Sequence, residues 1–180
     1  NIFYETEKWL NILGISDVGT LNEKIMENDL KDIVLVSEAL HEKKFANIAD
    51  NISKKNGVKI VLIAGPSSSG KTTFANRLSI QLRVNGFHPI PLSLDDYFVD
   101  REFSPRDENG EYDFESIYSL DLETLNNHLE KLLNGEEVEI PTYNFMKGKR
   151  EWLGHKVKLP QNGVLIVEGI HALNPVLTNL

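Results

Sequence analysis

The sequence predicts an α/β fold with a doubly wound, mostly parallel sheet, and two observations support this prediction. First, Val58–Ala64 and Val164–Val167 are short runs that are apolar apart from Lys59, which is typical of parallel strands buried on both faces. Second, a helical pattern over Lys71–Val84 follows the first run and leads to a strand-like segment, His88–Leu94. This order of strand, helix and strand favours a parallel sheet with helices on its faces.

The spacing of apolar residues supports each predicted helix of this region. Phe74, Leu78 and Leu82 recur every four residues, which predicts one buried face on the first helix. A second helix is predicted over Asp121–Leu133, and each helix is followed by an Asn-Gly pair that would end it. The intervening Arg101–Tyr112 segment is polar and rich in turn residues, so we expect a loop or hairpin there.

The N-terminal part has a helical pattern of apolar residues. Residues 1–57 are expected to form a helical segment or connector, with the longest helix over Asp29–Lys55. Residues 58–180 are expected to form the main domain. We therefore predict an α/β domain preceded by a helical appendage.

Composition and charge exclude several classes of protein. The net charge of -8 argues against broad binding to nucleic acid or to a membrane surface. The absence of cysteine excludes disulfides and thiolate chemistry and fits a cytoplasmic location. No run approaches the roughly 18 apolar residues of a membrane-spanning helix. A homo-oligomer remains open.

One motif predicts a nucleotide-binding site. Gly65–Thr72 fits the pattern G-x-x-x-x-G-K-[ST] and lies between the predicted strand and helix. In such a loop, backbone N–H groups face phosphates, Lys71 reaches the β- and γ-phosphates, and Thr72 ligates Mg²⁺. A serine-rich helix cap would explain the serines but not the Gly-Lys-Thr triplet. The residues predicted to bind ATP are Gly65, Ser67, Ser68, Ser69, Gly70, Lys71, Thr72 and Thr73. The fold expected is therefore that of a P-loop NTPase.

Carboxylates follow two of the predicted strands. Asp95 and Asp96 end the second strand, and Glu168 ends the last one. Because ligands bind at the carboxyl ends of parallel strands, these residues are candidates for a catalytic base and for metal binding. Helix capping and a solvated strand end are the competing explanations. The Asn-Lys-x-Asp pattern that selects guanine is absent, which disfavours a GTPase.

Four motifs in order resemble one known family. They are the Gly65–Thr73 loop, Ser93–Phe98, Pro141–Phe145 and Val167–Ile170, and together they are similar to the motifs of the uridine kinase and phosphoribulokinase family. The resemblance covers about residues 58–180 and is strongest to bacterial uridine kinase-like proteins. Some of these carry a region similar to the N-terminal part of threonyl-tRNA synthetase, to which residues 1–57 would be a connector.

The resemblance implies transfer of the ATP γ-phosphate to a nucleoside 5′-hydroxyl. It implies that Asp95 accepts the hydroxyl proton, that Lys71 and Glu168 join it in catalysis, and that Thr72, Asp95 and Glu168 surround Mg²⁺. The positions that it implies for acceptor binding are Asp96, Tyr97, Glu115, Tyr143, Phe145 and Arg150. Two positions depart from the family pattern: Glu115 replaces an aspartate that holds the ribose, and Gly148 replaces a histidine near the pyrimidine edge.

Three functions stay open at this point. The first is a kinase for uridine or cytidine, and the second is a kinase for another acceptor such as a sugar phosphate. The third is a non-catalytic nucleotide sensor. The family also carries an arginine-bearing lid after the Glu-Gly-Ile strand, so we expect the present chain to be a piece that binds nucleotide but transfers phosphate slowly.

Overall fold

The structure is a computed structural model that describes residues 2–177. The chain forms two compact units, one up to Ile48 and one from Ala49 onward. The last three residues of the predicted domain over residues 58–180 lie outside the described residues. Within the described part, no helix has the length and apolar character needed to cross a membrane.

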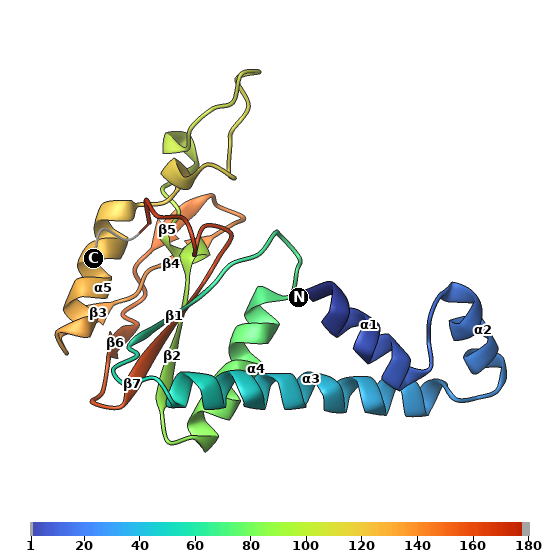
Figure 1. The fold of residues 1–180 in the computed structure, drawn as a ribbon. Coiled ribbons are helices and arrows are strands. Elements are labelled where there is room, and N and C mark those ends of the chain that lie inside the picture. Colours follow the sequence, from blue (N-terminus) through green and yellow to red (C-terminus); the bar gives the residue numbers. More distant parts are fainter. Residues whose placement is uncertain (1, 178–180) are drawn as a thin grey trace. The chain divides into compact units, whose positions relative to one another are not determined.

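The first unit is helical, as the sequence predicts. It contains α1 (Ile2–Leu13), α2 (Val18–Met26) and most of α3 (Leu30–Ser53) (Figure 1). Asp17 begins α2 through a capping box, because its carboxylate accepts the Thr20 N–H at 2.9 Å. The observed α3 confirms the long helix predicted over Asp29–Lys55.

A three-stranded parallel sheet forms the centre of the second unit. Its strands are β1 (Ile60–Ile63), β2 (His88–Ser93) and β7 (Gly163–Glu168), in the order β1-β7-β2. The central strand β7 is buried along its whole length, because it has neighbours on both sides and helices over both faces. The predicted parallel α/β sheet is confirmed.

The two long helices of this unit pack on opposite sides of the sheet, α4 (Lys71–Val84) on one and α5 (Leu122–Leu133) on the other (Figure 1). On α5, Leu125, Leu129 and Leu132 are fully buried and share one hydrophobic cluster with alternate residues of β7. The residues of α4 that are buried are Ala75, Leu78 and Leu82. The predicted face of α4 is thus shifted, because Phe74 is only half-buried.

Four short strands form two antiparallel pairs that the sequence analysis did not predict. β3 (Glu137–Glu139) pairs with β6 (Lys156–Lys158), and β4 (Thr142–Asn144) pairs with β5 (Lys149–Glu151). Each has three residues and mostly polar side chains. Cross-strand pairs of opposite charge, such as Glu137 opposite Lys158, stabilise such ladders where apolar alternation is absent.

A long connection joins β2 to α5. It begins with the 3₁₀ helix η1 (Leu94–Tyr97) and includes η2 (Arg101–Phe103) and η3 (Ile117–Ser119). An antiparallel bridge between Arg106 and Tyr112 closes a turn within it, which confirms the loop or hairpin predicted over Arg101–Tyr112. Figure 1 shows this connection extending beyond the carboxyl ends of the strands.

Gly169 allows β7 to end in close contact with η1, and we expect Gly169→Ala to destabilise the second unit. A Cβ at this position would lie 2.7 Å from the Cβ of Leu94 and 2.8 Å from its Cδ1. No rotamer moves a Cβ, so the backbone of η1 would have to shift. We expect a loss of about 1–3 kcal/mol in the free energy of unfolding, measured by urea denaturation. An unchanged midpoint would contradict this account of the contact.

Candidate active site

The loop between β1 and α4 has the geometry of a phosphate-binding loop. Gly70 precedes α4 with φ of 86°, and no side chain caps the helix there. Ser68 also has a positive φ, 57°. The first N–H groups of a helix have no partner within the helix, so those of α4 are available to an anion. A Cβ at Gly65 would lie 2.8 Å from the Ser69 Oγ, so a side chain there would force the Ser69 hydroxyl out of its present position.

Lys71 and Thr72 face different parts of the site. The Lys71 Nζ donates to the Pro66 carbonyl oxygen at 2.9 Å, which folds the lysine back over its own loop. The Thr72 hydroxyl donates to the Glu168 Oε1 at 2.9 Å. The Ser93 hydroxyl donates to the same oxygen at 3.2 Å. Glu168, at the end of β7, therefore links the start of α4 to the end of β2, and its side chain is buried between them.

The strand register explains this convergence. Ile63 and Ser93 are both paired with Glu168 across the sheet, so β1, β7 and β2 end at the same level. The loop that contains Lys71 follows the first of these ends, and Asp95 follows the third. Residues distant in sequence are thereby brought to one edge of the sheet, where ligands bind in folds of this kind.

Asp95 and Asp96 have different neighbours although they are adjacent in sequence. Loss of surrounding water raises the pKa of Asp95, and the charges of Glu168 and Asp96 raise it further, while Lys71 acts in the opposite direction. Burial likewise raises the pKa of Asp96, against the effect of the Tyr143 N–H that its Oδ1 accepts at 3.2 Å. Ser93 caps η1, so neither aspartate is needed as a helix cap. An elevated carboxyl pKa suits a general base.

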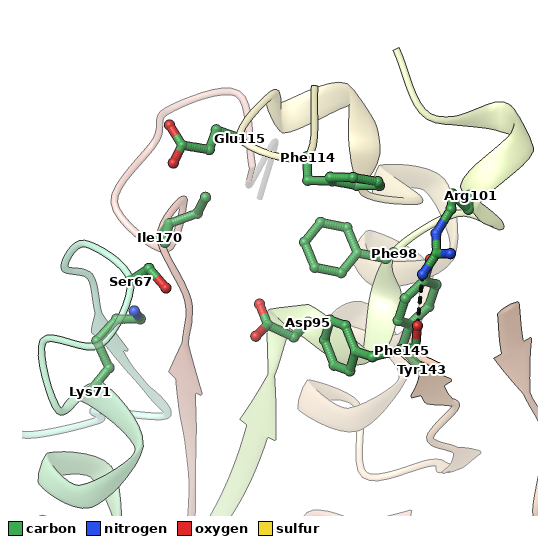
Figure 2. Close-up of a pocket in the computed structure, with 10 residues that line it drawn as sticks. All are labelled: Ser67, Lys71, Asp95, Phe98, Arg101, Phe114, Glu115, Tyr143, Phe145 and Ile170. Carbon is green, nitrogen blue, oxygen red and sulfur yellow. Dashed lines mark hydrogen bonds between the residues drawn. The ribbon is translucent and has the colours of Figure 1, made fainter. Parts of the chain in front are cut away.

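A cavity of about 360 Å³ extends from the phosphate-binding loop to a group of aromatic side chains. Figure 2 shows Ser67 and Lys71 at one end, Arg101 at the other and Asp95 between them. The residues that line it are Ser67, Lys71, Asp95, Phe98, Arg101, Phe114, Glu115, Tyr143, Phe145 and Ile170. The volume is within the range of small-molecule sites.

Aromatic rings form the end of the cavity away from the loop. The ring centroids of Tyr143 and Phe145 lie 5.0 Å apart, and Phe98 lies 5.5 Å from Tyr143, all with edge-to-face geometry. Phe114 lines the cavity close to Tyr112, at 5.8 Å between centroids. Such rings give an apolar surface against which a planar ligand can pack face-on or edge-on.

The structure brings some of the predicted acceptor-binding residues into this cavity and leaves others outside it. Glu115, Tyr143 and Phe145 line the cavity. Tyr97 is fully buried, with its hydroxyl 3.0 Å from the His128 Nδ1, because it anchors η1 to α5. Asp96 holds the backbone of β4 through Tyr143.

Arg150 also does not line the cavity. Its Nη1 donates to the Asp121 Oδ2 at 2.7 Å, and its guanidinium lies 5.5 Å from the Trp152 ring. Its N–H donates to the Asp100 Oδ1 at 2.9 Å. Because Asp121 also caps α5, Arg150 joins β5 to the start of that helix. These partners give Arg150 a structural role, and its predicted contact with the acceptor stays a prediction.

Four lining residues were missed in the sequence analysis: Phe98, Arg101, Phe114 and Ile170. Phe98 and Ile170 are part of motifs that were recognised, so their neighbourhood was a usable signal. Arg101 and Phe114 lie in or beside a polar, turn-rich segment, and the sequence contains no pattern that would orient them. Their position depends on how the β2–α5 connection folds back against the β4–β5 turn.

The residues at the loop fit a magnesium ion bound together with nucleotide phosphates. In the described part of the chain, no three His, Cys, Asp or Glu residues cluster to hold a metal by themselves. Mg²⁺ commonly takes only one or two protein ligands and completes its shell with water and phosphate oxygens. The Thr72 hydroxyl and the Glu168 carboxylate, already 2.9 Å apart, are oxygen donors of the required kind, and Asp95 lies near enough for its charge to interact with that of Glu168.

The fold is of the α/β class with a loop of phosphate-binding geometry after its first strand, and comparison with known proteins identifies the family. The family model for the Phosphoribulokinase / Uridine kinase family matches residues 60–176. The chain therefore belongs to this family.

Individual relatives agree with this assignment. The uridine kinase of Staphylococcus aureus (strain JH9) is 35% identical over 122 residues, which are 67% of this chain and 57% of that protein. A solved structure described as a possible uridine kinase from Bacillus stearothermophilus has a TM-score of 0.62 at 27% identity, covering 74% of this chain and 73% of that one. The chain thus spans a little over half the length of the curated relatives it matches.

We expect Glu168→Gln to weaken the contribution of Mg²⁺ to nucleotide binding by about 10- to 100-fold. Glutamine can still accept the Thr72 hydroxyl, so the loop is expected to keep its shape while the negative charge is lost. The measurement is the dissociation constant of a fluorescent ATP analogue with and without Mg²⁺.

The matched control is Glu130→Gln, which makes the same change on the exposed face of α5. Equal Mg²⁺ dependence in the wild type and Glu168→Gln would exclude Glu168 from the metal site.

Proposed function

We propose that the protein is an ATP- and Mg²⁺-dependent phosphotransferase that moves the γ-phosphate to the hydroxyl of a small molecule, and that this acceptor is the 5′-hydroxyl of a pyrimidine nucleoside. One observation supports this above all: Asp95 lies in a single cavity between Lys71 and Ser67 on one side and an aromatic wall on the other. This arrangement supports Asp95 as a base between the phosphates of ATP and a planar acceptor. The printed names of the relatives support the nucleoside.

In the proposed reaction, the loop N–H groups and Lys71 bind the phosphates, and Thr72 and Glu168 hold Mg²⁺, which would neutralise charge on the phosphate oxygens. The Asp95 carboxylate accepts the proton of the acceptor hydroxyl. The hydroxyl oxygen then bonds to the γ-phosphorus, and the bond from that phosphorus to the β-γ bridging oxygen breaks. ADP leaves with the electron pair, and Asp95 releases its proton to solvent.

The elevated pKa of Asp95 fits this role, because a base whose pKa lies nearer to neutrality holds the transferred proton more readily. Tyr143 and Phe145 would pack against the base of a nucleoside, and Glu115 would accept hydrogen bonds from ribose hydroxyls. The acceptor would contact protein on a mainly apolar surface at one end and carboxylates at the other.

The test is acceptor-dependent release of ADP by the full-length protein, with uridine, cytidine, inosine, adenosine and ribulose 5-phosphate offered in parallel. Nucleotide binding is measured on the present chain as well. ADP release with a nucleoside supports the proposal. Release with ribulose 5-phosphate alone would indicate a sugar-phosphate kinase, and tight ATP binding without release for any acceptor would indicate a nucleotide sensor. We propose a cytoplasmic location because the sequence contains no cysteine, which fits a reducing compartment.

A further inference from the structure

Arg101 lies at the end of the cavity opposite the phosphate-binding loop. It lines the same cavity as Lys71 and Asp95, and Figure 2 shows its guanidinium beside the aromatic group, with Asp95 lying between it and the loop. An acceptor that places its hydroxyl at Asp95 would therefore direct its far end toward this arginine. None of the motifs considered above includes Arg101.

The guanidinium is held in place by the β4–β5 turn. The Arg101 N–H donates to the Gly148 carbonyl oxygen at 2.8 Å, and its Nη2 donates to the Phe145 carbonyl oxygen at 2.7 Å. Gly148 has φ of 64°, and a Cβ there would lie 2.8 Å from both the Cζ and the Nε of Arg101. The glycine thus leaves the space that the arginine fills, and the turn accepts one hydrogen bond from the Arg101 backbone and one from its guanidinium.

The chemistry of this arginine favours a ligand that accepts hydrogen bonds. A guanidinium has five N–H donors and no acceptor, and the bond to Phe145 uses only part of that capacity. Arg101 also acts on Tyr143: burial raises the pKa of the Tyr143 hydroxyl, and the nearby guanidinium opposes that rise. Charged donors beside apolar rings gain most from a ligand with a carbonyl or anionic oxygen at that end.

The aromatic rings around Arg101 favour a carbonyl oxygen over the anionic oxygen of a phosphate as its partner. Phe98, Tyr143 and Phe145 pack edge-to-face into an apolar wall, and a planar ring packs against the face or edge of such rings better than a phosphate with its water shell. A guanidinium in the plane of a nucleobase pairs with its oxo group, as in the contact of arginine with the O6 and N7 atoms of guanine.

We propose that Arg101 is a specificity-determining residue that donates hydrogen bonds to the exocyclic oxygen at C4 of a pyrimidine acceptor or at C6 of a purine acceptor, the position at which cytidine and adenosine carry an amino group. The acceptors preferred are then oxo-substituted nucleosides, such as uridine, inosine and guanosine. Their amino-substituted counterparts, cytidine and adenosine, present N–H donors to the donors of Arg101 and are disfavoured, since a site built for one hydrogen-bond pattern rejects the opposite one. This inference rests on the proposed function and names its substrate class.

The experiment compares kcat/KM for uridine and cytidine, and for inosine and adenosine, in the full-length wild type and in Arg101→Met. In whichever pair the wild type phosphorylates, we expect kcat/KM for the oxo nucleoside (uridine or inosine) to exceed that for its amino counterpart by about tenfold or more. We expect Arg101→Met to lower kcat/KM for the oxo nucleoside by about 10- to 100-fold, with that for the amino nucleoside changed by less than about threefold. Arg101→Lys keeps the charge but loses the planar fork, and we expect it to lose most of the discrimination.

Lys147→Met is the matched control. It removes a positive charge from the same β4–β5 turn at a residue that is exposed and does not line the cavity, and it should leave the ratio unchanged. The proposal would be overturned if the wild type had equal kcat/KM for the oxo and amino nucleosides. It would also be overturned if Arg101→Met and Arg101→Lys lowered kcat/KM equally for both. ADP release with ribulose 5-phosphate alone would overturn it as well. If no acceptor gives ADP release and calorimetry detects no nucleoside binding, the proposed function fails and this inference fails with it.

Discussion

Asp95→Asn is expected to abolish most phosphoryl transfer while it stabilises the protein in the absence of Mg²⁺ and nucleotide. Loss of a positioned general base commonly costs about 10²- to 10⁴-fold in rate, and the amide of the variant could not accept the proton of the acceptor hydroxyl. We expect kcat to fall by this amount with nucleotide binding retained. The measurement is acceptor-dependent ADP release, together with the dissociation constant of a fluorescent ATP analogue.

The gain in stability follows from the pKa of Asp95. Burial, Glu168 and Asp96 raise the pKa above its unfolded value, so the folded state binds this proton more tightly than the unfolded state. The stabilisation from that proton is present at low pH and is lost as the pH rises through the folded pKa. At neutral pH the ionised carboxylate therefore destabilises the folded protein, and the neutral amide removes that penalty.

The corresponding readout is the melting temperature in a metal-chelating buffer. We expect Asp95→Asn to melt above the wild type at pH 7. The difference should shrink as the pH falls through the raised folded pKa of Asp95 and should be lost below about 4, where aspartate in an unfolded chain is also protonated. Glu108→Gln, at an exposed position in the β2–α5 connection, is the control for charge alone. Full turnover in Asp95→Asn would rule out its assignment as the base. A lower melting temperature would show that the charged carboxylate is a stabilising partner instead.

Much of this fold could be predicted because its elements carry local signals. Val164–Val167 reads as a buried strand since β7 is central and its environment is apolar on both faces. The phosphate-binding loop is predictable because its signal is local: Gly70 has a φ of 86°, which favours glycine, and it directly precedes Lys71 at the start of α4. Both signals are contained in the segment itself.

The acceptor end of the cavity was harder to predict, since it depends on contacts between distant segments. Tyr97 follows Asp95 and Asp96 directly, yet its side chain faces α5 because η1 turns it into the core. Strand β5 has the polar sequence Lys149-Arg150-Glu151 and forms only because β4 pairs with it. Arg101 is held at the cavity by hydrogen bonds to carbonyl groups in the β4–β5 turn, and no local sequence pattern predicts that contact.

Lys71→Met should separate binding of nucleotide from phosphoryl transfer most sharply. Without nucleotide, the Lys71 Nζ is bonded to a carbonyl of its own loop, that of Pro66, in an exposed position, so its loss should cost little stability. In the reaction it would meet charge that grows on the transferred phosphoryl group, and removing one such donor typically costs about 10²- to 10³-fold in kcat. We expect that loss in ADP release, a weaker affinity for ATP, and an unchanged urea midpoint.

Lys59→Met is the matched control for this substitution. Lys59 also donates its Nζ to a backbone carbonyl, that of Gln161 at 2.7 Å, but it lies at the start of β1, at the opposite end of the sheet from the loop. The two variants thus lose the same kind of hydrogen bond at the two ends of one strand. A rate loss in Lys71→Met alone ties the lysine to the phosphates. Equal behaviour of the two variants would mean that the loop binds nucleotide through its backbone alone, and the proposed role of Lys71 in transfer would be wrong.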